Sequence, residues 1–443
     1  MAGSHRAPRG GGRAAAREAR RQKARKRNQT IAAGAAVVIL VGGGGVAALN
    51  AFGGDKTPGP KVGSGPADDK PSESNVLADD KSLLDAASAK TFGATGAWTV
   101  AKTADGGSAP DSVFVCQTQR FADPSGLRTW VRTFQNATTK DTAVQYIEVS
   151  NDKATASKTY TSVVRWLSQC SVAQTRLISS YVTTGVGERG VLAVFSQPAG
   201  AKTKYKTVAV TLAGQATMVV EHDTLASKPP GPAAVLTTAQ AAAKKICGQS
   251  GGCGSGAPVA KPALLPNLDA PGFMAPADLP VLDEIKKPWV SAPAAKSSGG
   301  TCEKIDFKKA KAANYSTLTY VTPEAQVPTE FGLDDTVARF GTQAAAASFV
   351  SQIRKNVDGC EKTVSNAKVE STGALKTSTV TGESWKASYD TGDGKKFVYR
   401  IGIAGSGSRA VYLLFPVLKG LDISDAAFNE TLARAADRSA TFQ

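Results

Sequence analysis

The sequence is poor in histidine. Only two of its 443 residues are histidines, His5 and His222. Catalytic triads with a histidine base and metal sites built from several histidines need more than this. His222 ends a strand-like run, "TMVVEH", where a lone histidine is usually a surface or hydrogen-bonded residue. The composition therefore argues against two large groups of enzymes.

Charge is absent from one long stretch. No charged residue occurs in the 22 positions from Ile31 to Phe52. At about 1.5 Å per helical residue, such a run can cross a hydrocarbon layer about 30 Å thick. The sequence thus predicts a transmembrane helix over residues 31–52. Because residues 42–45 are four glycines, which weaken a helix, a cleaved export signal is the alternative.

Acidic residues are scarce before this stretch. Residues 1–30 hold ten Lys and Arg against a single acid, Glu18. Basic residues beside a membrane span stay on the cytoplasmic side, so we expect 1–30 to be the cytoplasmic arm of a cell-membrane protein. Residues 53–443 are then extracytoplasmic. Topology and attraction to anionic lipid heads explain the arm, and we expect no nucleic-acid partner.

Cysteine is absent from residues 1–115, and all six cysteines follow in the predicted outer part. An even number of cysteines in an oxidising compartment predicts disulfides, and the C-x2-C spacing of zinc sites does not occur. Residues 53–77 are rich in Gly, Pro, Ser, Asp and Lys and are expected to form a flexible extracellular linker. A second Gly/Pro-rich linker, 251–263, separates two predicted domains, 78–250 and 264–443.

The two predicted domains repeat one pattern. "TYTSVVRWLSQC" (159–170) and "FVSQIRKNVDGC" (349–360) are both amphipathic helix stripes that end in a cysteine. An earlier cysteine stands at a similar distance before each stripe and precedes a strand-like run. Three antiparallel strands and a final helix follow, from a capping-box pattern at Thr237 in one copy and a Ser424 cap in the other. We therefore predict an α+β fold of two similar domains, each an antiparallel sheet packed by helices.

The repeated order also predicts the disulfides. Cys116 should bond to Cys170, and Cys302 to Cys360, so that each pair closes a loop of roughly 55 residues. The remaining pair, Cys247 and Cys253, most simply closes on itself.

Few residues suggest a site. Glu188 and Glu383 each follow a glycine at what look like matching positions, which a ligand role explains, as does an acid at a solvent-exposed turn. Residues 248–252 fit G-x-S-x-G, but a helix precedes them and a linker follows, so a loop between two cysteines is the better interpretation. We expect no catalytic residue, cofactor or metal.

Together these features resemble the PknH-like extracellular sensor domain of actinobacterial membrane proteins. The resemblance covers about 80–247 and 265–443 and implies a tandem pair of disulfide-stapled α+β domains with a cleft for an extracellular ligand. The family is usually described with two disulfides per domain, whereas the second block has only two cysteines. Unlike the receptor kinases of that family, this chain has no kinase motif in its cytoplasmic arm.

We therefore expect a non-catalytic, single-span membrane protein that binds an unidentified small molecule or a cell-wall or lipid component outside the cell. A membrane signalling partner would carry the signal inward. A cell-envelope hydrolase that uses carboxylates such as Asp334 and Asp335 is one alternative. A structural envelope scaffold is the other.

Overall fold

The computed structural model describes residues 78–93, 95–292, 299–328, 331–390 and 396–443. They belong to one compact unit, Val76–Gln443, and contain two antiparallel sheets with a few helices, an α+β fold of two domains. The predicted cytoplasmic arm, membrane span and linker (1–77) lie outside the described residues. Among the described helices, none is long and apolar enough to cross a membrane.

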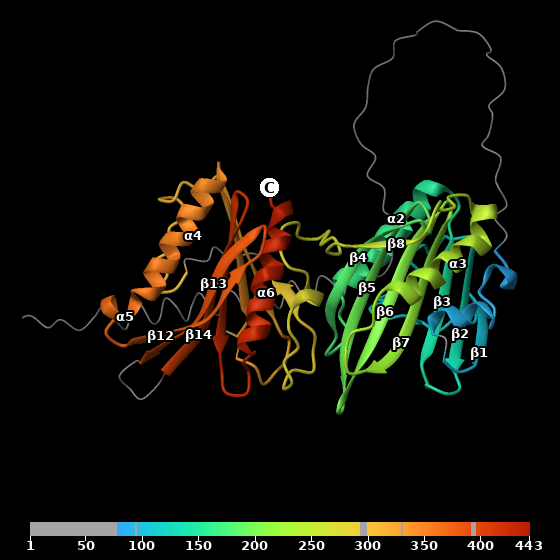
Figure 1. The fold of residues 1–443 in the computed structure, drawn as a ribbon, viewed down its shortest axis with the longest axis horizontal. Helices are drawn as coiled ribbons and strands as arrows, with labels where there is room; N and C mark the ends of the chain where they lie inside the picture. Colours follow the sequence, from blue (N-terminus) through green and yellow to red (C-terminus); the bar gives the residue numbers. More distant parts are fainter. Residues whose placement is uncertain (1–77, 94, 293–298, 329–330, 391–395) are drawn as a thin grey trace, which may run out of the picture. The chain divides into compact units, whose positions relative to one another are not determined.

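The first domain is built on a sheet of eight strands. Along the sheet they follow the order β1-β2-β3-β7-β6-β5-β4-β8 (Figure 1). Every neighbouring pair is antiparallel. The strands are β1 (Trp98–Asp105), β2 (Arg128–Asn136), β3 (Thr142–Val149), β4 (Arg176–Thr184), β5 (Arg189–Ala199), β6 (Lys202–Ala213), β7 (Ala216–Ala226) and β8 (Val259–Pro262).

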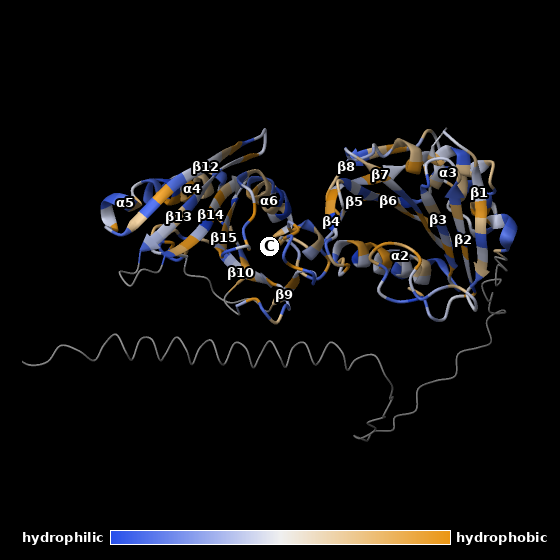
Figure 2. Cartoon of the chain, turned by 90° about the horizontal axis from the view of Figure 1, so that it is seen from below, coloured by the Kyte–Doolittle hydropathy of each residue, from blue (hydrophilic) through white to orange (hydrophobic). Residues whose placement is uncertain are grey.

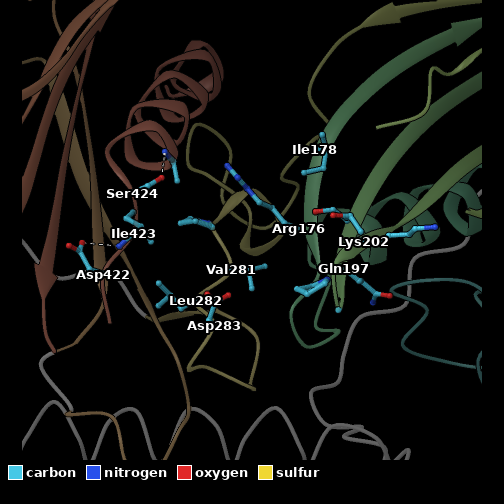
Figure 3. A pocket seen from close by; sticks show the side chains of 17 residues that line it. Arg176, Ile178, Gln197, Lys202, Val281, Leu282, Asp283, Asp422, Ile423 and Ser424 are labelled. Carbon is cyan, nitrogen blue, oxygen red and sulfur yellow. Dashed lines mark hydrogen bonds between the residues drawn. The ribbon is translucent and has the colours of Figure 1, made fainter. Parts of the chain in front are cut away.

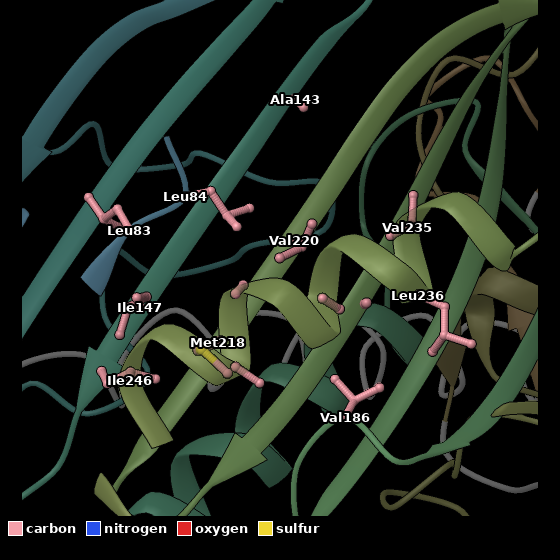
Figure 4. Packing of buried hydrophobic residues seen from close by; sticks show 14 of the residues in the cluster. Leu83, Leu84, Ala143, Ile147, Val186, Met218, Val220, Val235, Leu236 and Ile246 are labelled. Atoms are coloured by element: carbon pink, nitrogen blue, oxygen red, sulfur yellow. The ribbon is translucent and has the colours of Figure 1, made fainter. Parts of the chain in front are cut away.

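Two helices cover the two faces of this sheet. Helix α2 (Lys153–Ser168) buries Val163 and Leu167 against one face, and the Asp152 side chain caps its first turn. Helix α3 (Ala233–Ser250) packs on the other face together with the short helices η1 (Asp80–Ser82) and η2 (Ser88–Phe92). Figure 4 shows α3 lying across the strands, with Leu236 and Ile246 on its buried side. The predicted capping box at Thr237 is wrong, because α3 begins four residues earlier, at Ala233.

The second domain has a sheet of seven strands in the order β12-β13-β14-β15-β11-β10-β9. Helix α4 (Gln343–Asp358) and the short α5 (Cys360–Thr363) lie on one face, and α6 (Asp425–Arg438) lies on the other with η4 (Ser439–Thr441). The short η3 (Pro276–Asp278) contacts α2 and β4 of the first domain. In Figure 2, hydrophobic and hydrophilic residues alternate along α4, as expected for a helix with one buried face. The strands are β9 (Val290–Ala292), β10 (Asn314–Val321), β11 (Leu333–Arg339), β12 (Ala367–Lys376), β13 (Val380–Asp390), β14 (Lys396–Ser406) and β15 (Arg409–Val417).

The two sheets have the same topology. Read from one edge, β4-β5-β6-β7-β3-β2-β1 matches β12-β13-β14-β15-β11-β10-β9, and each sheet has a helix before β4 or β12 and another after β7 or β15. The predicted order omitted strands on both sides of the first helix, such as β3 and β4. Among the described residues, strand β8 has no counterpart in the second sheet, and it lies inside the predicted linker 251–263.

All three predicted disulfides are present. Cys116 is bonded to Cys170 and Cys302 to Cys360, so the loop before β2 or β10 is tied to the end of α2 or α4. Cys247 and Cys253 close the short loop after α3.

Candidate functional site

A cleft of about 480 Å³ lies between segments of the first and second domains (Figure 3). Its walls come from β4, from the hairpin of β5 and β6, from the segment after η3, and from the turn that begins α6. Eight of the residues that line the cleft are polar or charged: Arg176, Ser196, Gln197, Lys202, Thr203, Asp283, Asp422 and Ser424.

Arg176 is the most constrained cation of the cleft. It is the first residue of β4, and its side chain is only 14% exposed. Its Nε and Nη2 atoms are buried and have no hydrogen-bond partner among the described residues, although Nη2 lies 3.1 Å from Glu430 Oε2. Figure 3 shows the side chain extending from β4 towards the start of α6. The buried Nε–H donor that remains without a partner suits a ligand that carries hydrogen-bond acceptors.

The start of α6 forms the opposite wall. The N–H of Ala427 donates to Ser424 Oγ at 3.2 Å, so the predicted Ser424 cap is confirmed. The positive end of the helix dipole therefore lies at the cleft. Lys202 adds an exposed ammonium from β6, and Asp283 is an acid on the same cleft.

Asp422 is paired with two cationic side chains of the second domain. Its carboxylate accepts hydrogen bonds from Arg400 Nε at 2.6 Å and from Lys386 Nζ at 3.0 Å. Burial alone would favour the neutral acid, but these hydrogen bonds hold the pKa of Asp422 below its usual value. Asp422 thus anchors the turn before α6 to the sheet, and the other charged residues of the cleft are Arg176, Lys202 and Asp283.

The cleft wall on β4 is held by Arg434 of α6. Strand β4 has a register shift between Leu177 and Ser179, which marks a bulge at Ile178. Arg434 donates to the carbonyl oxygens of Leu177 at 2.5 Å and Ile178 at 3.0 Å. These contacts fix the bulge beside Arg176.

The two acids predicted as ligand candidates do not line the cleft. Glu188 is exposed at the start of β5, where a side chain at Gly252 (φ +70°) would collide with its carboxylate. Glu383 lies in β13 and forms an ion pair with Arg354 of α4, with Arg354 Nε 2.7 Å from its Oε2. Glu383 therefore links a helix to the sheet.

The expected match between these two acids is wrong. Gly190 pairs with Thr211, two residues before the end of β6, and Gly382 pairs with Ala404, two residues before the end of β14. Gly382 thus corresponds to Gly190, and Glu383 corresponds to Val191. The β5–β6 and β13–β14 hairpins set the register of these strands. Gly187-Glu188 therefore lies three residues before the position that corresponds to Gly382-Glu383.

Other residues that the sequence suggested have structural partners. Ser250 of the G-x-S-x-G string is buried at the end of α3, and its hydroxyl lies 3.2 Å from the carbonyl oxygens of Ile246 and Gly251. The His222 ring packs against Phe92 and Trp98, which also contact each other. Burial lowers the pKa of His222, although Asp141 opposes this shift.

Two buried carboxyl groups have pKa values raised by burial to about 7, Glu221 in β7 and Asp335 in β11. Glu221 accepts the N–H of Val115 at 2.7 Å, and Asp335 accepts that of Met274 at 3.2 Å. Neither lines the cleft. They tie loops to the sheets and are not placed to act on a bound substrate there.

Comparison with protein-family models and with curated proteins gives no match for this chain. The cleft residues were not found by sequence reasoning either, because they come from four separate segments. The only sequence signal near the cleft was the Ser424 cap.

Proposed function

We propose that this is a membrane-anchored, extracytoplasmic ligand-binding protein of the sensor type, without catalytic activity, that binds a small polar molecule or envelope component in the cleft. The proposal rests on Arg176, whose buried Nε has no partner among the described residues, beside a polar cleft of about 480 Å³. That volume lies within the range of small-molecule sites. The three disulfides support an oxidising compartment outside the cytoplasm.

The proposed mechanism is recognition between the two domains. Arg176 and Lys202 belong to the first sheet, whereas Asp283 and Ser424 belong to the second part of the chain. A ligand that contacts both walls would bind best when the walls are closely spaced and would stabilise that arrangement. The PknH-like resemblance points to the same kind of role, with a membrane partner as receiver. The carboxylate hydrolase is less favoured, because the carboxyls with raised pKa lie away from the cleft.

A thermal-shift experiment on the full chain in detergent tests the proposal. The probes are N-acetylmuramic acid, the D-alanyl-D-alanine dipeptide and glycerol phosphate, three polar components of bacterial envelopes. We expect at least one to raise the melting temperature of the wild type and of Lys244→Ala, a change on the exposed side of α3. The rise should disappear in Arg176→Ala and Gln197→Ala.

A shift that persists in both cleft variants would reject the cleft as the site, and no shift with any probe would count against these ligand classes. Release of a product from any probe would instead favour the hydrolase.

A further inference from the structure

Six exposed lysines lie around the Cys302–Cys360 disulfide of the second domain. The loop from Cys302 to β10 carries four of them, and α4 and α5 carry one each. The Cα atoms of the two cysteines are 5.2 Å apart, so the start of the loop lies beside α5. We call this group the lysine surface, and its members are Lys304, Lys308, Lys309, Lys311, Lys355 and Lys362.

Packing of the loop leaves its lysines in solvent. Phe307 lies against Tyr315 of β10 and Phe349 of α4, with ring centroids 4.6 and 5.4 Å apart. Three further apolar residues of the loop pack against the same core: Ile305, Ala310 and Ala312. The four lysines occupy positions between these residues, and all are exposed. The loop thus buries its apolar side chains and keeps its ammonium groups in water.

A hydrogen bond joins this loop to α4. The side-chain amide of Asn356 donates to the carbonyl oxygen of Glu303 at 2.8 Å. Lys304 follows Glu303 along the chain, and Lys355 precedes Asn356. The loop and the helix therefore place lysines next to the same contact.

The lysine surface carries excess positive charge. In the part of the chain that the structure describes, none of its lysines forms an ion pair. Three exposed acids accompany it, Asp306, Asp358 and Glu361, and each accepts a hydrogen bond from an N–H of its own domain. The neighbouring carboxyl group of Glu303 is buried. Six lysines against three acids leave a net charge of +3, which favours an anionic partner.

The first domain builds the equivalent loop with little charge. Phe121 stands five residues after Cys116, as Phe307 stands five after Cys302. The single cation between Cys116 and β2 is Arg120, which donates to a backbone carbonyl at 2.9 Å and lies over the Phe121 ring. In both domains a disulfide ties the loop to the end of a helix. The fold therefore does not require the lysines of the second domain, which points to a role in binding.

The chemistry of the lysine surface favours a long, flexible polyanion. Lysines are mobile point charges that bind phosphate without the fixed geometry of an arginine fork. Among the described residues, this surface exposes no large apolar side chain, the kind that anchors proteins in a lipid layer. A chain with repeated phosphate groups contacts several lysines at once, and each linked contact strengthens the others. Neutralising its phosphates also releases their counterions.

We infer that the lysine surface binds a phosphate-bearing polymer of the cell envelope. The polymer lies along the loop after Cys302 and reaches the lysines of α4 and α5. The surface shares no residue with the cleft, so it binds whether or not the cleft holds a ligand. The chain thereby contacts the envelope at a second point, outside the proposed ligand site.

Chemical modification of lysines tests the inference with the full chain in phosphatidylcholine nanodiscs. An amine-reactive reagent is added, and peptide mass mapping gives the modification of each lysine. Long-chain polyphosphate at ten times its dissociation constant should slow modification of the lysine surface by about tenfold. Lys102 and Lys244, which are exposed on the first domain, should react as before.

Two other probes decide between occupants of the lysine surface. Orthophosphate at the same total phosphate concentration should leave the modification rates unchanged, and protection equal to that by polyphosphate would mean a small-anion site and reject the polymer. Nanodiscs that contain phosphatidylglycerol, without polymer, should also leave the rates unchanged. Protection by these nanodiscs would identify a lipid surface as the occupant and overturn the inference.

A matched pair of variants measures the contribution of the loop. The loop variant combines Lys304→Gln, Lys308→Gln, Lys309→Gln and Lys311→Gln. The control combines four changes at exposed lysines of the first domain, Lys102→Gln, Lys158→Gln, Lys228→Gln and Lys244→Gln. The basic arm, 1–30, is unchanged in both, so any binding of polymer to it cancels.

The loop variant should keep the wild-type melting temperature and bind polyphosphate at least about tenfold more weakly. The slope of log affinity against log salt concentration should fall in magnitude by about 3, because four phosphate contacts are lost. The control should match the wild type in both measurements. Equal weakening in the two variants would show that net charge alone attracts the polymer, and the lysine surface would then be no specific site.

Discussion

Gln145 and Asp335 occupy equivalent positions in the two sheets, and each accepts a backbone N–H from the segment that leads into its domain. Leu84 donates to Gln145 Oε1 at 2.6 Å, and Met274 donates to Asp335 Oδ2 at 3.2 Å. Both side chains are fully buried. The same structural task is thus performed by an amide in one domain and by a carboxyl group in the other.

This difference predicts a pH-dependent stability that Asp335→Asn removes. Burial raises the pKa of Asp335 from 3.8 to about 7. Between these values the unfolded chain is ionised while the folded chain keeps its proton, so the unfolded state binds fewer protons and stability falls as pH rises. The loss is on the order of 4 kcal/mol by pH 8. Asp335→Asn should therefore become more stable relative to the wild type between pH 4 and pH 8, as measured by urea unfolding.

Gln145→Glu is the matched control in the first domain. It places a carboxyl group at the equivalent buried position, so it should introduce a fall in stability over a similar pH range. If the stability difference between Asp335→Asn and the wild type stayed the same from pH 4 to pH 8, the pKa of Asp335 would not be raised in the folded protein, and our account of this position would fail.

The cluster around Lys206 gives a second prediction. Lys206 Nζ lies 2.9 Å from Glu221 and 2.6 Å from Asp223, and its side chain is 16% exposed. Lys206→Met leaves the buried Glu221 without its cation and Asp223 with only the more exposed Lys204, and it should cost about 3 kcal/mol at pH 8. The cost should be smaller at pH 5, where Glu221, with a pKa raised by burial to about 7, is neutral.

Lys204→Met tests whether burial matters in this cluster. Lys204 Nζ also lies 2.9 Å from Asp223, but 40% of its side chain is exposed. Because water screens such a pair, its loss should cost less than about 1 kcal/mol. Urea unfolding of both variants at pH 5 and pH 8 decides the point. If Lys206→Met cost the same free energy of unfolding at both pH values, the raised pKa of Glu221 would be contradicted.

Local patterns in the sequence predicted the repeat well. The amphipathic stripes before Cys170 and Cys360 determine which helix face is buried, and the cysteine spacing determines the two long disulfide loops. Both signals lie within single segments of chain. They could therefore be read without knowing how distant segments meet.

Features that depend on distant segments were missed or misread. The four residues of β8 lie in a Gly/Pro-rich stretch and form a strand because the edge of β4 offers backbone partners. The match proposed between Glu188 and Glu383 failed because hairpin pairing sets the register. Arg176 gave no signal, since its surroundings come from α6, far later in the chain.

The disulfides predict a ranking of stabilities. The bonded cysteines are separated by 54 and 58 positions in the two long loops and by 6 in the short one. In the chain-entropy model, each long loop contributes about 4 kcal/mol and the short one about half as much. Replacing Cys116 and Cys170, or Cys302 and Cys360, by Ser should therefore destabilise the protein about twice as much as replacing Cys247 and Cys253. Denaturant unfolding of the three double variants measures the ranking, and a larger loss for the short loop than for either long one would contradict it.

Arg434 should couple the unfolding of the two domains. Its guanidinium donates to the carbonyls of Leu177 and Ile178. A hydrogen bond from a charged group contributes about 1.5–3 kcal/mol. Calorimetry of the wild type should give one unfolding transition, and Arg434→Ala should split it into two, because the two bonds from Arg434 of α6 to the carbonyls of β4 are lost.

Lys244→Ala is the control for this variant, because it removes the same charge from the exposed side of α3 and should retain a single transition. If Arg434→Ala also unfolds in one step with an unchanged midpoint, the contact does not couple the domains. The proposal that a ligand acts by stabilising closely spaced cleft walls would then have no physical basis.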